Sequence, residues 1–134
     1  MLYETYKPYE NLGIRVMSSE PSLRWLLDAD VRIGFLRSFK VKKASGKEVL
    51  GECILVNKLY EPFCPYDFLI VIYAESVAGL TDDQMYMLMH HELLHVGVQE
   101  KNGEMKYRVV PHDIEDFEEI LSRYGVHWAK QESR

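Results

Sequence analysis

The chain has 134 residues, of which 47% are hydrophobic and 28% are charged, and its net charge is −5. This length and composition predict one folded domain over residues 1–134, with its core at about residues 20–128 and a polar C-terminal tail. No apolar run of about 18 residues is present, which excludes a transmembrane helix. A signal peptide needs an apolar stretch, whereas the chain opens with MLYETYKPYENLG, so we expect a cytoplasmic protein.

Neither the basic residues nor the cysteines indicate a special function. Lysines cluster only at positions 40–43, beside turn-forming residues 44–47, which predicts a solvated hairpin tip and no nucleic-acid-binding surface. Cys53 and Cys64 do not form a C-x-x-C pair, and we expect a buried thiol at each position.

The first two thirds of the chain predict short helical turns followed by strands. Residues 23–27 favour one or two helical turns, and alternating apolar residues at 31–41 favour a strand with a bulge. The turn at 44–47 then predicts a hairpin whose returning strand covers residues 49–59. Two prolines at positions 62 and 65 prevent a strand there. The continuous apolar run at residues 68–73 predicts a buried strand.

A helix with a clear start follows this strand. Thr81 and Gln84 have the spacing of a capping box, in which their side chains bind free backbone N–H groups at a helix start. We therefore expect a helix from residue 82 to about residue 98. Asn102-Gly103 predicts a turn, residues 105–110 a short strand, and a last helix begins near residue 111 and stops at Gly125.

The histidines of the capped helix are spaced to bind a metal ion. His91 and His95 are four residues apart, so both imidazoles lie on one helix face and form two corners of a tetrahedral zinc site. Glu92 is rotated about 100° from His91, beside the metal, where its carboxylate can take a proton from zinc-activated water. The alternative is that the two histidines are structural side chains, either buried and hydrogen-bonded or exposed.

A catalytic zinc site needs a third protein ligand and an open position for water. His112 is the strongest candidate, because it follows a loop long enough to turn the chain back, with Asp113 or Glu115 as alternatives. His127 is expected at the surface or in packing. We expect His90, which points away from the His91 face, to be exposed or to support the site by contacting the residues around the metal rather than the metal itself.

Two further pairs of residues are compatible with supporting functions. Asp113 or Asp116 could accept the second N–H of a metal-bound imidazole, although acidic residues are also common in the first turn of any helix. Tyr107 or Tyr124 could place a phenol near a transition-state oxyanion, but the sequence does not select between nine tyrosines.

The motif residues resemble a known family. The segment LMHHELLH at residues 88–95, followed by HDIEDF at 112–117 and preceded by YDFLIVI at 66–72, resembles the putative phage metallopeptidase family and, more broadly, minimal zincins related to SprT-like proteases. The resemblance implies an α+β, zincin-like fold: a sheet of three or slightly more strands, packed on the motif helix and a C-terminal helix. It also implies His91, His95 and His112 as metal ligands and Glu92 as general base.

We therefore expect a zinc-dependent metallopeptidase that hydrolyses peptide bonds in a peptide or protein substrate, in the host cytoplasm if the protein is phage-encoded. A substrate could add a strand to the sheet edge, with residues 68–73 as one candidate for that edge. The alternative is a non-catalytic zinc-binding phage or prophage protein that binds a host partner, with Asp113 or Glu115 closing the water position. A weaker alternative is hydrolysis of a non-peptide amide.

Overall fold

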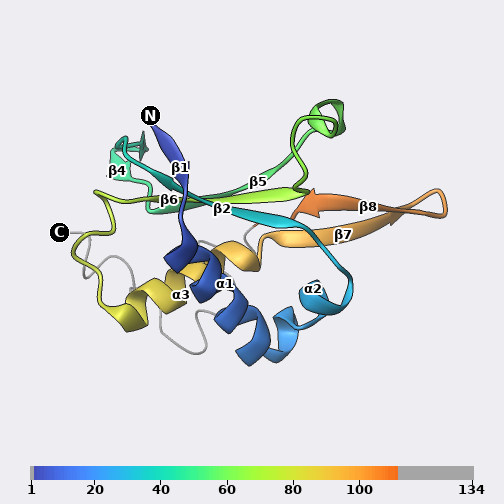
Figure 1. The fold of residues 1–134 in the computed structure, drawn as a ribbon, viewed down its shortest axis with the longest axis horizontal. Coiled ribbons are helices and arrows are strands. Elements are labelled where there is room, and N and C mark those ends of the chain that lie inside the picture. The colour runs from blue at the N-terminus through green and yellow to red at the C-terminus, as the bar shows by residue number, and fades with distance from the viewer. Residues whose placement is uncertain (1, 112–134) are drawn as a thin grey trace.

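The structure, a computed structural model, describes residues 2–111 and has the expected α+β fold (Figure 1). Within this part of the chain none of the helices is long and apolar enough to cross a membrane. The elements in chain order are β1 (Tyr3–Thr5), α1 (Lys7–Ser19), η1 (Pro21–Leu23), α2 (Trp25–Asp28), β2 (Ile33–Ser38), β3 (Lys43–Ala44), β4 (Lys47–Glu48), β5 (Gly51–Leu55), η2 (Lys58–Tyr60), β6 (Phe68–Tyr73), α3 (Asp82–Leu93), β7 (Val96–Lys101) and β8 (Glu104–Val109).

Four strands form the main sheet, in the order β1-β2-β6-β5. β6 runs parallel to β2 and antiparallel to β5. The expected hairpin between the strands at residues 31–41 and 49–59 is therefore wrong, because β6 lies between β2 and β5. Only the short strands β3 and β4 pair at the tip, which is exposed as predicted.

β6 takes the central position because both of its faces are apolar. Phe68, Ile70 and Ile72 are fully buried on one face, and Val71 and Tyr73 are buried on the other. A continuous apolar run of this kind is typical of a strand in the interior of a sheet, and β6 pairs with β2 on one side and β5 on the other. The suggestion that residues 68–73 form the sheet edge is therefore wrong, and the edge strand on this side is β5.

Both long helices lie on the same face of the sheet (Figure 1). The mixed composition of the first twenty residues did not predict α1, yet its residues Gly13, Val16 and Met17 are buried. A Cβ atom at Gly13 would lie 2.4 Å from Cζ of Phe35 in β2, so the absence of a side chain lets α1 approach the sheet. The predicted helical turns at residues 23–27 are confirmed as η1 and α2.

The motif helix α3 is shorter than expected. It ends at Leu93, and the chain passes at once into β7, where the alternating Val96-Gly97-Val98 sequence favours a strand over a helix. β7 and β8 form a hairpin that projects from the body of the protein (Figure 1). Asn102 and Gly103 supply its predicted turn, with φ angles of 56° and 80°. The last predicted helix lies outside the described residues.

Candidate metal centre

The start of α3 is fixed by the predicted capping box. The Thr81 hydroxyl accepts a hydrogen bond from the Gln84 backbone N–H at 3.2 Å, and the Gln84 side chain accepts one from the Thr81 N–H at 2.8 Å. Buried side chains then hold the helix against α1 and the sheet, namely Leu88, Met89 and Leu93. The helix therefore ends in a fixed position, and its last turn carries His91 and Glu92.

His91 and His95 lie side by side at this helix end. Their ring centroids are 5.2 Å apart and their planes are inclined by 73°. The His91 side chain is 13% exposed, so its ring is largely enclosed but open to solvent on one side. His95 lies just beyond the helix, where its N–H donates to the Glu92 carbonyl at 3.1 Å. Two imidazoles in adjacent positions are the kind of donor pair that zinc binds.

The backbone of Val110 orients the His95 ring. The Val110 N–H donates to the His95 carbonyl at 2.6 Å, and Nδ1 of His95 lies 2.6 Å from the Val110 carbonyl oxygen. A carbonyl can only accept, so Nδ1 carries the proton and Nε2 keeps the lone pair. The His95 backbone N–H is bonded to the Glu92 carbonyl at the helix end and does not pair with Val110. The imidazole Nδ1–H donates to the Val110 carbonyl in its place, next to the last pair of the β7–β8 ladder. Metal-bound histidines commonly have this arrangement of the second ring nitrogen.

Gly97 lets Val110 approach His95 this closely. A Cβ atom at Gly97 would lie 2.4 Å from Cγ2 of Val110, which is far inside ordinary contact distance. The absence of a side chain at position 97 therefore lets the Val110 side chain pack against β7. Sequence reasoning missed both residues, although an isolated glycine within a strand often marks such a close approach.

Glu92 lies between the histidines and the edge strand β5. It is 4% exposed, and its Oε2 atom is 4.0 Å from Nε2 of His91. A Cβ atom at Gly51 would lie 3.3 Å from Cγ of Glu92, so β5 can approach the carboxylate because position 51 has no side chain. Burial, with the charge of Glu92, raises the pKa of the neighbouring Cys53 thiol to about 12. Cys53 and Cys64 are free thiols, half-buried rather than buried as expected.

The outer side of β5 directs backbone groups away from β6 near Glu92. Leu50 accepts a hydrogen bond from Tyr73, and Val56 donates one to Asp67. Because inward and outward backbone groups alternate along an antiparallel edge strand, residues 51, 53 and 55 direct their N–H and C=O groups away from β6. Such an edge can pair with an added extended peptide.

His90 is fully buried, so of the two positions expected for it, exposed or supporting the site, the exposed one is wrong. Its Nε2 atom lies 3.9 Å from Oε1 of Glu20, which is itself buried at the end of α1. The Tyr86 hydroxyl donates to Oε2 of Glu20 at 2.6 Å. These three side chains join α1 to α3 behind the His91–His95 pair, which is a supporting position.

The comparison with protein families gives one match. The family described as "Putative phage metallopeptidase" matches residues 2–133, almost the whole chain. The chain belongs to this family. No curated protein and no solved structure matched the chain. The family description implies a metal cofactor and peptide substrates for this phage-type metallopeptidase.

The described residues include two of the three expected metal ligands, His91 and His95. Among residues 2–111 no group of three or more His, Cys, Asp and Glu side chains is placed to hold an ion. The His91–His95 pair, with Nε2 of His95 as the unprotonated nitrogen, fits two of the nitrogen positions that zinc uses. The other predicted site residues lie outside the described part of the chain: His112, Asp113, Glu115, Asp116, Tyr124 and His127.

Tyr107 is placed away from the role suggested for it. It lies on β8, packs edge-on against Phe68 with ring centroids 5.5 Å apart, and lines a cavity at the end of the sheet. This environment gives Tyr107 a packing function and a position in that cavity.

Proposed function

We propose that the chain is a zinc-dependent metallopeptidase in which His91, His95 and His112 hold the metal and Glu92 is the general base. The observation that supports this most directly is the hydrogen bond from Nδ1 of His95 to the Val110 carbonyl, since it sets the tautomer that a metal requires. His112, the proposed third ligand, follows Val110 by two residues in the sequence.

When bound, zinc would act as a Lewis acid that polarises the scissile carbonyl and lowers the pKa of water to about 7. The residues of the chain perform the proton transfers. Glu92 takes the proton of the attacking water and passes it to the leaving amine, as a general base and then a general acid. Its burial beside His91 keeps the carboxylate directed at this position and excludes bulk water from it.

The substrate would bind as an extended strand along β5. The outward backbone groups of residues 51, 53 and 55 can form a ladder with a peptide, and Gly51 brings that ladder beside Glu92. Backbone pairing binds any sequence, so it positions the scissile bond without selecting side chains.

The first experiment is native mass spectrometry with elemental analysis of the wild type and His112→Ala. We expect one zinc ion per wild-type chain and its loss from most of the variant. Zinc retained at full occupancy in His112→Ala would move the third ligand to another residue. A wild type that binds no metal after zinc is supplied would contradict the proposal.

Glu92→Gln separates catalysis from binding. It keeps the shape of the side chain but cannot accept the proton, so we expect zinc content to remain and peptide cleavage to fall by at least about 100-fold. If a biological effect of the protein persists unchanged in Glu92→Gln, the non-catalytic zinc-binding function is favoured. Cleavage of simple amides but not of peptides would favour the remaining alternative, hydrolysis of a non-peptide amide.

A further inference from the structure

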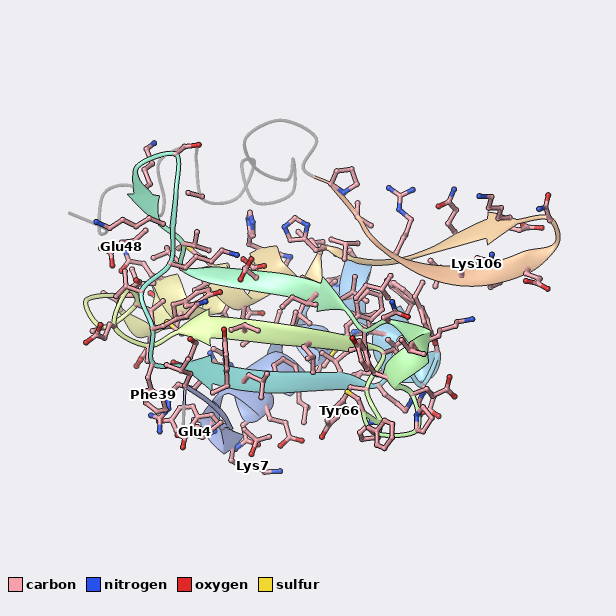
Figure 2. The ribbon with its side chains drawn as sticks, turned by 90° about the horizontal axis from the view of Figure 1, so that it is seen from above. Glu4, Lys7, Phe39, Glu48, Tyr66 and Lys106 are labelled. Atoms are coloured by element: carbon pink, nitrogen blue, oxygen red, sulfur yellow. The ribbon has the colours of Figure 1, made fainter. Side chains whose placement is uncertain are left out.

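A cavity of about 600 Å³ opens where β5 ends, between the loop that follows β5 and the projecting hairpin. In Figure 2, Tyr66 and Lys106 lie at this end of the sheet, Lys106 on the hairpin and Tyr66 on the loop that leads into β6. Apolar side chains make up much of its lining, namely Leu55, Val56, Tyr66, Met105 and Tyr107. Leu55 and Met105 are 41% and 65% exposed, so these large apolar groups face solvent rather than the core.

The charged groups of this cavity lie around the apolar lining. Arg32 is fully engaged by Asp67, with Nη2 to Oδ1 and backbone N to Oδ2 distances of 3.0 Å. Lys58 and Lys106 come from opposite walls, and Glu61 is the acidic side chain near them. Within residues 2–111 none of these three takes part in an ion pair. The rim therefore carries an excess of positive charge over an apolar interior.

The cavity is in line with the outer edge of β5. Gly51, which lies against Glu92, and Leu55, which lines the cavity, point to the same face of the sheet because side chains alternate along a strand. They are four residues apart, or about 14 Å. β8 packs close to β5, so a peptide that follows the edge away from Glu92 arrives at the space between the two strands.

We propose that this cavity is a specificity subsite that binds a large apolar side chain of an extended peptide, about four residues from the substrate residue opposite Gly51. This inference rests on the proposed peptidase function and adds the selection of side chains that backbone pairing lacks. A bulky apolar residue matches the lining, and the volume of about 600 Å³ leaves room for it together with adjacent substrate residues, of which an acidic one would be stabilised by Lys58 and Lys106 at the rim.

The subsite can be tested by cleavage and by binding, with matched variants of the hairpin. Met105→Gln keeps the length of the side chain but makes this wall polar. Val98→Gln is the control, because Val98 is 38% exposed on the same hairpin and is not part of the cavity. Cuts in a proteome-derived peptide library are mapped by mass spectrometry. In parallel, Glu92→Gln protein is titrated with two labelled decapeptide pools that have Phe or Gly at one fixed central position.

We expect large apolar residues to be favoured about tenfold at one position, about four residues from the cut, and the Phe pool to bind about tenfold more tightly than the Gly pool. Met105→Gln should reduce both preferences, and Val98→Gln should keep them. Cleavage without such a preference would overturn the subsite and leave the peptidase function standing. An absence of cleavage, with a Phe preference that depends on Met105, would overturn the peptidase function and support a peptide-binding cavity. An absence of both would overturn both proposals.

Discussion

Replacing Gly97 with alanine should weaken zinc binding although residue 97 touches no metal ligand. The new Cβ atom would lie 2.4 Å from Cγ2 of Val110, whereas ordinary contacts begin at 3.4 Å. The Val110 side chain would have to turn or shift by about 1 Å, and we expect the accompanying movement of Val110 to lengthen the 2.6 Å hydrogen bond between its carbonyl and Nδ1 of His95. Loss of such a partner typically lowers metal affinity by about 10- to 100-fold.

The assay is competition for zinc between the protein and a chelator of known affinity, with circular dichroism to confirm folding. Two variants serve as controls. Gly79→Ala adds a Cβ atom with nothing within 4 Å, so its zinc affinity should equal that of the wild type. Val110→Ala removes Cγ2 but keeps the carbonyl, so the double variant Gly97→Ala/Val110→Ala should recover most of the lost affinity.

The role of the contact between Gly97 and Val110 would be refuted by a folded Gly97→Ala protein that binds zinc as tightly as the wild type. It would also be refuted if the double variant remained as weak as the single one, because the effect would then not arise from the contact with Val110.

Three other predictions concern residues around the site. Gly51→Ala places a Cβ atom 3.1 Å from Cδ1 of Ile72, 3.2 Å from the Val71 carbonyl oxygen and 3.3 Å from Cγ of Glu92, so β5 and Glu92 must shift apart slightly and kcat/KM for a cleaved peptide should fall severalfold with zinc content unchanged. Tyr86→Phe removes a hydrogen bond to the buried carboxylate of Glu20, and urea unfolding should show a loss of about 1–3 kcal/mol; an unchanged midpoint would contradict this. The pKa of the Cys53 thiol rises from 9.0 to about 12 on folding, so between these pH values the folded state keeps a proton that the unfolded state has lost. The contribution of this thiol to the free energy of unfolding is therefore lost as pH rises through that range. Urea unfolding at about pH 8 and about pH 10.5 should therefore show a smaller loss of stability in Cys53→Ala than in the wild type.

Local sequence signals predicted the elements that carry the site. The capping box at Thr81 and Gln84, the apolar strand Phe68–Tyr73 and the turn at Asn102-Gly103 all form as predicted. Each depends on side chains that act within a few residues of one another, so the pattern alone determines the structure. His91 and His95 also lie side by side, although α3 ends at Leu93 and His95 is not on the same helix as predicted.

Strand order and the helix end depended on interactions that the local pattern does not contain. β6 separates β2 from β5 because a strand with two apolar faces is most stable in the centre, which no hairpin signal in residues 31–59 indicates. The end of α3 at Leu93 follows from the pairing of the next residues with β8. The contribution of Val110 could not be predicted, because it comes from a backbone carbonyl, which every residue has.

The position of β6 between β2 and β5 also constrains how the protein folds during synthesis. β2 and β5 leave the ribosome first, but neither pairs with the other, and the partner of both is made later. The parallel pairing joins residues about 35 positions apart, such as Ile33 and Phe68, and contacts of this range form slowly. The edge strand beside Glu92 therefore has no fixed place in a nascent chain until residue 73 has been added. A chain interrupted before that point contains no part of α3, so incomplete copies of this length lack His91, Glu92 and His95 as well as the partner of β5.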